Sequence, residues 1–331
     1  MKLAFFERSS EPFSLDIYIK NVIKELKVFG VEAIPFNEDA GIPDDCDLVW
    51  EPAIAGARPP SRIFKSLKNK PLVVTIHGAA PFVMPIKDIS YSLLNGIRIK
   101  LRCYRTLYEW IWFRKKVSAV VTVSNFAVKE IANVYRLPLE MINVIYHGVN
   151  HTIFNPDGYY YKEGYFLVVG GDRRIKNLER IIEAYRRLPV EERPKLIGIV
   201  PGYKRDIKVP GVELITQGKE PAELAKYYRG ALCLVFPSLR ESFGMPIIEA
   251  MACGCPVITS NSSACAEIAQ DAALLVNPYS VDEIAEAMNI IVKDANLRET
   301  LRRKGIERAS HFSWQRCSEE HLKVFERVLR K

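Results

Sequence analysis

Residues 237–255 read PSLRESFGMPIIEAMACGC, and they join an apolar run at 232–236 to the start of a helix. The apolar run is short and uncharged, which is typical of a buried parallel strand. We expect the helix to begin near Gly244 and Pro246, because a proline in the first helical turn loses no hydrogen bond. The backbone N–H groups of residues 243–245 would then lie at the positive end of the helix, which favours a bound anion.

Two carboxylates flank this predicted anion site, Glu241 on the turn and Glu249 inside the helix. A carboxylate beside an anion site is costly unless it binds a neutral group, such as a hydroxyl. Phosphate and polyol side by side indicate a nucleotide sugar. Two glutamates at this spacing would be weak evidence alone, since a solvated helix face often carries such a pair.

The whole block resembles the retaining glycosyltransferases of family 4 (GT4), and within them the mannosyltransferase-like branch. The matching pattern is P-S-x-x-E-S-F-G-x-P-x-x-E-A-M-A-C-G-x-P-V-I at 237–258. It continues through the serine-rich run at 260–263, Glu267 and DAALLVNP at 271–278. The resemblance implies an α/β fold of the GT-B type, with two Rossmann-like, doubly wound parallel-sheet domains that face a cleft.

The resemblance also implies roles for the residues of this block. Glu241 approaches the hydroxyls and the reacting face of the donor sugar, and Glu249 accepts hydrogen bonds from the ribose 2′ and 3′ hydroxyls. Such charge-assisted hydrogen bonds contribute roughly 1.5–3 kcal/mol each. The remaining donor-binding residues of the block are Ser242, Phe243, Gly244 and Met245.

A second phosphate-binding loop is predicted at 170–177, which reads GGDRRIKN between a strand and a helix. Its two glycines, of which Gly171 is assigned to the donor, permit close approach of the backbone, and its cations suit a departing diphosphate. The resemblance to GT4 enzymes implies that Lys176 binds the diphosphate, with Asn177 beside it. We choose Arg173 as the matching arginine rather than the arginine that follows it. A solvated basic surface is the alternative for this loop.

The sequence VVTIHGA at 73–79 places His77 at the carboxyl end of a predicted strand, where a doubly wound domain binds its ligand. A histidine there is often structural, but the motif resembles the GT4 pattern in which a histidine approaches the donor sugar. Ser124 is expected to cap the helix that follows it, and His147 stands where the family usually has asparagine, so it has no role in the mechanism. The predicted catalytic residues are therefore His77, Glu241, Arg173 and Lys176.

Strand-like and helical runs alternate along the chain, which predicts parallel sheets with right-handed crossovers. We expect strands at 2–6, 31–36, 47–50, 72–77, 119–124, 142–148, 165–170, 195–200, 212–216, 232–236, 257–260 and 273–276. With 331 residues the chain suits two domains. We predict an acceptor-side domain at 1–158, a nucleotide-sugar-binding domain at 159–312, and a C-terminal helix at 313–331 that returns to the first domain by resemblance.

The composition favours a cytoplasmic protein. No uncharged apolar run reaches the length of a transmembrane helix, and Glu7 and Arg8 end the first apolar run too early for a signal peptide. The seven cysteines, an odd number, indicate reduced thiols. Cys253 and Cys255 lack a second pair or a nearby histidine, so no metal site is expected.

Two segments depart from a simple glycosyltransferase. The loop at 7–14 has no glycine, whereas GT4 proteins commonly carry a glycine-rich loop there. The sequence therefore does not identify the acceptor. Residues 98–116 carry seven Lys/Arg, one acidic residue and several aromatic residues within a chain of net charge +8. They predict a helix that binds an anionic membrane surface, or a helix half packed on its domain with cations extended to solvent. No nucleic-acid-binding fold accompanies them.

We therefore predict a metal-independent, retaining hexosyltransferase without a cofactor. It would move a hexose, with mannose favoured, from a nucleoside diphosphate sugar to a glycan or a lipid-linked acceptor. GDP-mannose is the favoured donor and a UDP-sugar is the alternative. Two competing hypotheses are a nucleotide-sugar isomerase on the same fold, which needs further carboxylate acid/base pairs, and a basic binding protein without chemistry.

Overall fold

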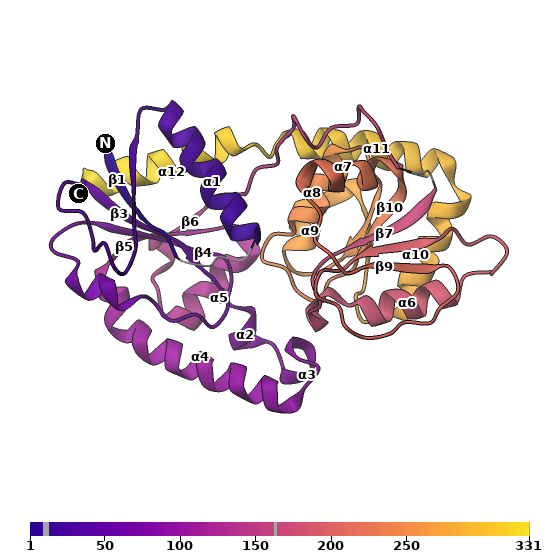
Figure 1. Ribbon diagram of the computed structural model, residues 1–331, viewed down its shortest axis with the longest axis horizontal. Helices are drawn as coiled ribbons and strands as arrows, with labels where there is room; N and C mark the ends of the chain where they lie inside the picture. The colour runs from indigo at the N-terminus through magenta and orange to yellow at the C-terminus, as the bar shows by residue number, and fades with distance from the viewer. Residues whose placement is uncertain (9–12, 162–163, 331) are drawn as a thin grey trace. The chain divides into compact units, whose positions relative to one another are not determined.

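The fold was obtained as a computed structural model, and the structure describes residues 1–8, 13–161 and 164–330. The chain forms two compact units (Figure 1). The first comprises Met1–Lys87, Ser92–Gly148 and the chain from Trp314 onward, and the second comprises Asp88–Tyr91 and Val149–Ser313. Of the loop expected at 7–14, residues 9–12 lie outside the described residues.

The first unit is built on a six-stranded parallel sheet in the order β2-β1-β3-β4-β5-β6. Its strands are β1 (Lys2–Phe6), β2 (Glu32–Phe36), β3 (Leu48–Ile54), β4 (Leu72–Ile76), β5 (Val117–Thr122) and β6 (Ile142–Val144). All six predicted strands are present, and β3 continues beyond its predicted end at residue 50.

Helices cover both faces of this sheet, so its strands are apolar on both sides. They are α1 (Phe13–Val28), α2 (Ala80–Val83), α4 (Leu93–Phe113), α5 (Asn125–Tyr135) and α12 (Trp314–Leu329), while α3 (Ile86–Ile89) is divided between the two units. Trp110 and Phe113 of α4 pack with Val74 and Ile76 on one face, and α1 packs with α12 on the other. Ser124 Oγ accepts the N–H of Ala127, which confirms its predicted capping role.

A buried chain of hydrogen bonds ties α12 to α1 and the sheet. Trp50 Nε1 donates to Thr75 Oγ1 at 3.0 Å, and Thr75 Oγ1 lies 3.3 Å from Tyr18 Oη. Tyr18 Oη lies 2.7 Å from His321 Nε2, and His321 Nδ1 lies 2.7 Å from the carbonyl oxygen of Cys317. Because Nδ1 faces a carbonyl, it carries the proton, and Nε2 accepts from Tyr18. Burial lowers the pKa of His321 to about 4.

The second unit has its own six-stranded parallel sheet, in the order β12-β11-β10-β7-β8-β9. Its strands are β7 (Tyr165–Val169), β8 (Leu196–Ile199), β9 (Val212–Ile215), β10 (Ala231–Phe236), β11 (Val257–Ser260) and β12 (Leu274–Val276). Its helices are α6 (Leu178–Arg186), α7 (Pro221–Gly230), α8 (Met245–Ala252), α9 (Ser263–Ala269), α10 (Val281–Lys293) and α11 (Ala295–Ser310). All six predicted strands are again present.

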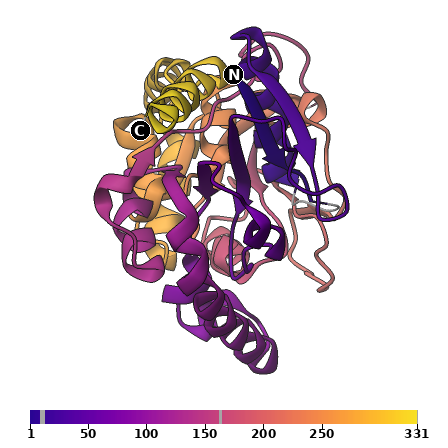
Figure 2. The same ribbon diagram turned by 90° about the vertical axis from the view of Figure 1, so that its left-hand side faces the viewer.

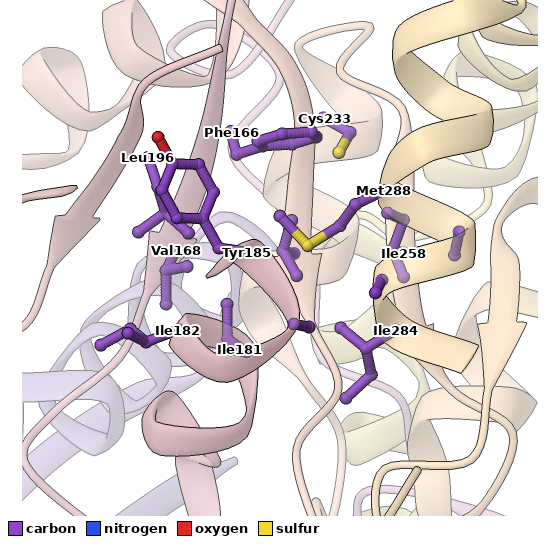
Figure 3. Close-up of a cluster of buried hydrophobic side chains, with 14 of the residues drawn as sticks. Phe166, Val168, Ile181, Ile182, Tyr185, Leu196, Cys233, Ile258, Ile284 and Met288 are labelled. Atoms are coloured by element: carbon purple, nitrogen blue, oxygen red, sulfur yellow. The ribbon is translucent and has the colours of Figure 1, made fainter. Parts of the chain in front are cut away.

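The main core of the second unit lies between its sheet and the helices α6 and α10 (Figure 3). Ile181 and Tyr185 of α6 meet Met288 of α10 over Val168 and Ile258 of the sheet. Each fully buried large apolar side chain contributes about 1.5–3 kcal/mol. Helices α7, α8 and α11 lie on the other face (Figure 1).

Each sheet has a point where successive strands change sides. In the first sheet it lies between β1 and β3, and in the second between β7 and β10. Loops at the carboxyl ends of the two flanking strands diverge there, and doubly wound proteins bind ligands at this point.

The second unit begins at Val149, earlier than the boundary at 159 expected from the sequence. The guanidinium of Arg229 in α7 explains this difference. It donates to the carbonyl oxygens of Ile153 at 2.9 Å and Asn155 at 2.8 Å, which fixes the polar segment to the second unit. Among the described helices, none is both long and apolar enough to span a bilayer.

The buried histidine predicts an acid-sensitive first unit. Between pH 6.5 and 4 the unfolded chain binds a proton that folded His321 excludes, so the free energy of unfolding falls as the pH falls. The free energy of unfolding falls by about 3 kcal/mol in total, because folding lowers the pKa of His321 from 6.5 to about 4. Denaturant titrations at several pH values should show a shallower pH dependence in His321→Gln than in wild type.

His311 is exposed, so His311→Gln is the matched control and should keep the wild-type slope. An unchanged slope in His321→Gln would show that this imidazole is not a source of the acid sensitivity.

Candidate functional site

Helix α8 begins where the sequence predicts, directly after the turn from β10. Gly244 has a φ of 102°, and a Cβ at this position would meet Ile247 Cδ1 at 3.0 Å. Both the backbone conformation and the space therefore favour glycine. Pro246 lies in the first turn of α8, as expected.

The structure brings together two predicted catalytic residues, Lys176 and Glu241. Lys176 ends the short turn η4 (Arg174–Lys176) after β7, and Glu241 lies on the turn after β10. Lys176 Nζ donates to Glu241 Oε1 at 2.6 Å, and the two side chains are 12% and 14% exposed. A Cβ at position 170 would meet Lys176 Cγ at 3.2 Å, so Gly170 gives the lysine stem its room. The ion pair lies at the switch point of the second sheet.

The backbone of Glu241 is fixed as well. Its N–H donates to Ser263 Oγ at 3.2 Å, and its carbonyl oxygen accepts the N–H of Ala264 at 3.2 Å. Both partners belong to the first turn of α9. Ser263 belongs to the serine-rich run that matches the family pattern, but the sequence alone assigned it no role. Its position between a predicted strand and the next helix was the feature of the sequence that could have indicated a role at the site.

Glu249 is buried on α8 and is 9% exposed. Tyr228 of α7, fully buried, donates its hydroxyl to Glu249 Oε2 at 3.0 Å. Burial raises the pKa of Glu249 to about 7, while the Tyr228 hydroxyl and the nearby Lys176 ammonium act in the opposite direction. A carboxylate held at such a pKa is typical of a functional site. Tyr228 had no signal in the sequence, because its contact depends on how α7 packs against α8.

The side chain of Asn177 makes hydrogen bonds that the sequence did not predict. Its amide Nδ2 donates to the carbonyl oxygens of Pro237 at 2.8 Å and Pro278 at 2.7 Å, and its Oδ1 accepts from Arg180 at 2.9 Å. The side chain is buried, so its polar atoms are committed to the protein. Asn177 therefore joins three loops beside the predicted site, and its assignment to the donor stays a prediction.

The other predicted donor residues differ in how accessible they are. Arg173 is exposed, whereas the guanidinium of Arg174 lies 5.3 Å from the ring centre of Tyr91. A Cβ at Gly171 would meet nothing within 4 Å, so its backbone is open to a ligand. Phe243 packs its ring against Phe312, at 5.9 Å between centres, and can offer only its backbone. Ser242 and Met245 are half-buried.

His77 lies in the first unit, at the end of β4. Its Nε2 is 2.8 Å from the carbonyl oxygen of Pro52, so Nε2 carries the proton. Burial lowers the pKa of His77 to about 4, which keeps the imidazole neutral at pH 7. The ring lies 4.7 Å from Tyr18 and 5.4 Å from His147, centre to centre. His147 is buried in the same aromatic cluster.

A groove of about 1240 Å³ opens on the first unit. Its lining includes Arg8, Lys20, Lys24 and Arg102, and basic residues outnumber acidic ones along it. Arg8 Nη2 donates to the fully buried Glu51 at 2.8 Å, and this ion pair joins β1 to β3 at the switch point of the first sheet. The predicted site residues lie elsewhere.

Residues 43–153 match the family model described as Glycosyltransferase Family 4, and residues 150–308 match that of Glycosyl transferases group 1. The chain belongs to the family 4 glycosyltransferases. The two matches together span residues 43–308, which include parts of both units, and the predicted family is confirmed.

Curated relatives of this glycosyltransferase include several mannosyltransferases. It is 34% identical to O-antigen chain mannosyltransferase B of Escherichia coli over 174 residues, which is 49% of this chain and 46% of that protein. It is 31% identical to the O-antigen chain mannosyltransferase RfbU of Salmonella typhimurium over 66% of this chain and 64% of that protein. The chain thus spans about half to two thirds of the length of these relatives.

Solved structures confirm the GT-B fold of the glycosyltransferase. Sucrose-phosphate synthase from Thermosynechococcus elongatus superimposes with a TM-score of 0.77 at 18% identity over 99% of each chain. HepE of Anabaena, solved in complex with UDP and glucose, superimposes with a TM-score of 0.69 at 15% identity over 98% of this chain and 99% of its own.

The buried carboxylate predicts that Glu249 destabilises the empty glycosyltransferase. Its pKa is raised on folding, so it lowers the free energy of unfolding as the pH rises from 4.5 to 7. Glu249→Gln should therefore raise the free energy of unfolding at pH 8 by up to about 3 kcal/mol. The difference from wild type should disappear near pH 4.5.

Glu286 is an exposed glutamate of α10 and provides the control. Glu286→Gln should leave the stability close to wild type at both pH values. A Glu249→Gln protein that is no more stable than wild type at pH 8 contradicts the raised pKa.

Proposed function

We propose that this glycosyltransferase transfers mannose, with retention of the anomeric configuration, from GDP-mannose to a glycan or lipid-linked acceptor. The observation that carries the proposal is the cluster at the switch point of the second sheet. A buried carboxylate, Glu249, lies there on the helix that follows the Lys176–Glu241 ion pair. Two of the relatives are O-antigen chain mannosyltransferases, which supports mannose as the sugar.

In the proposed complex, the donor spans this cluster. Glu249 accepts the ribose hydroxyls, and the positive end of α8 lies against the phosphates. Lys176 is a compact cation whose partner Glu241 is a carboxylate on a fixed backbone. When the diphosphate arrives, Lys176 can share its three donors between Glu241 and a phosphate oxygen, and Glu241 can accept from a sugar hydroxyl.

The transfer itself is proposed as a same-face attack in which the leaving phosphate takes the proton of the acceptor hydroxyl. Lys176 and the exposed Arg173 neutralise the leaving diphosphate, a task in which fixed cations are effective because charge develops there. A neutral His77 is suited to hydrogen-bond a sugar hydroxyl without adding charge. We propose that no metal ion or cofactor is needed.

The acceptor is proposed to bind the groove of the first unit. The excess of basic residues along its lining, from Arg8 to Arg102, favours an acceptor that carries phosphate, such as a lipid-linked diphosphate sugar. The seven cysteines are free and buried, which supports a reducing compartment such as the cytoplasm.

A donor screen tests the proposal. GDP-mannose should raise the thermal midpoint more than UDP-glucose, because a ligand that binds only the folded state stabilises it. The protein should then hydrolyse GDP-mannose slowly in the presence of a metal chelator. A preference for UDP-glucose would overturn GDP-mannose as the proposed donor. A 2-epimerised sugar product would favour the isomerase hypothesis.

Two matched substitutions separate the roles of the glutamates. Glu249→Gln should weaken GDP and GDP-mannose binding alike by about 1.5–3 kcal/mol, because both ligands lose a charge-assisted ribose contact. Wild-type affinity for GDP should also rise from pH 6 to 8 as Glu249 ionises, and this rise should be absent in the variant. Isothermal titration calorimetry measures both effects.

Glu241→Gln should leave GDP binding close to wild type but lower the rate of donor turnover. Equal loss of GDP binding in the two variants would remove the distinction between the glutamates.

A further inference from the structure

Helix α4 of the first unit has two apolar faces. One packs into the core of the unit through Cys103, Trp110 and Phe113, all buried. The other carries a row of large apolar side chains that the structure leaves exposed. They are Leu93, Leu94, Ile97, Leu101, Tyr104, Tyr108 and Ile111, with exposed fractions from 41% at Ile97 to 75% at Tyr108.

The spacing places the exposed row on a single stripe. Ile97, Leu101, Tyr104, Tyr108 and Ile111 follow one another at four- and three-residue steps, which is the repeat of one helix face. On a helical projection the stripe lies opposite the packed face. Figures 1 and 2 show α4 along the outside of its unit. Soluble surfaces rarely keep so continuous an apolar row without a binding role.

Cations line one side of the stripe. Arg98, Arg102 and Arg105 follow it at the same helical steps and are exposed. The acidic residue of this helix, Glu109, accepts from Arg105 Nε at 3.1 Å, so it is partly neutralised within the helix. Exposed Lys115 continues the direction of the stripe beyond the end of α4.

Other cations of the segment are occupied by the protein. Lys100 Nζ donates to the carbonyl oxygens of Pro81 at 2.9 Å and Met84 at 2.7 Å, which ties α4 to α2. Arg114 Nη1 donates to the carbonyl oxygen of Arg136 at 3.2 Å. One face of the helix is thus packed, as the half-packed interpretation of 98–116 predicts, and the membrane interpretation stays a prediction.

A second copy of the chain does not suit this surface. Two copies joined through the stripe would bring the cationic sides of α4 together, since an isologous contact uses the same patch twice. An anionic lipid surface complements both features, because its headgroups meet the arginines and its acyl boundary accepts the leucines. Tyrosine also suits the boundary between headgroups and acyl chains.

We propose that α4 docks in the plane of an anionic membrane through its exposed stripe. The proposal deepens the lipid-linked acceptor proposed above, but it rests on the surface of α4 alone. A protein held in this way would meet a lipid-linked acceptor in two dimensions, with the groove of the same unit beside the cationic edge, since Arg102 and Arg105 line that groove.

Vesicle sedimentation tests the proposal without any sugar donor. Wild-type protein should bind vesicles of phosphatidylcholine mixed with phosphatidylglycerol, bind pure phosphatidylcholine less, and dissociate as salt is added. The stripe variant Leu94→Gln/Leu101→Gln should bind roughly tenfold more weakly or worse. The charge variant Arg98→Gln/Lys115→Gln should weaken binding roughly twentyfold at low salt.

The control is Val28→Gln/Leu139→Gln, which removes two equally exposed apolar side chains from other parts of the unit. It should bind vesicles as wild type does. Glutamine is a good helix former, so the stripe variant should keep its thermal midpoint and its response to GDP-mannose. This keeps failure of the membrane proposal separate from failure of the donor proposal.

Wild-type protein that stays in the supernatant at low salt would overturn the proposal. So would a control variant that loses as much vesicle binding as the stripe variant. A wild-type dimer in sedimentation velocity that the stripe variant abolishes would assign the surface to a second copy instead.

Discussion

The ion pair between Lys176 and Glu241 connects the two loops at the switch point of the second unit. The two residues are distant in sequence, and they meet because β7 and β10 are parallel neighbours whose following loops leave the same edge of the sheet. The first sheet repeats this arrangement, since Arg8 after β1 pairs with buried Glu51 of β3. In both sheets a cation after the first strand neutralises a carboxylate of the neighbouring strand or its loop. An ion pair thus joins the two strands or their loops at each switch point.

The site keeps its carboxylates at an energetic cost. Glu249 is held among buried side chains by one hydroxyl, and Glu241 depends on a partner that a diphosphate would compete for. Burying a carboxylate opposes its ionisation, so Glu249 lowers the free energy of unfolding at neutral pH and above. Asn177 and Ser263 act differently, since they fix the loops that carry these groups and use their own polar atoms in doing so.

The sequence predicted the strands well because their patterns are local: short apolar runs end at turns and alternate with amphipathic helices. It also predicted the start of α8, which Gly244 and Pro246 encode directly. It could not predict contacts that depend on packing between distant segments, such as Tyr228 with Glu249. Nor could it predict the carbonyl groups that surround the Asn177 amide, because a motif shows where a side chain stands but not what packs around it. The sequence also could not show which apolar face of α4 is exposed, because both of its faces are apolar.

The position of α12 has a consequence for how the chain folds during synthesis. The first unit is composed of the start of the chain and this late helix, whereas the second unit lies almost wholly between them. Until residues 314–329 leave the ribosome, the Tyr18 hydroxyl lacks its hydrogen bond to His321, and one face of the first sheet lacks α12. Domains usually fold as units as they emerge. The second unit can therefore complete its fold before the first, although the first unit contains the start of the chain.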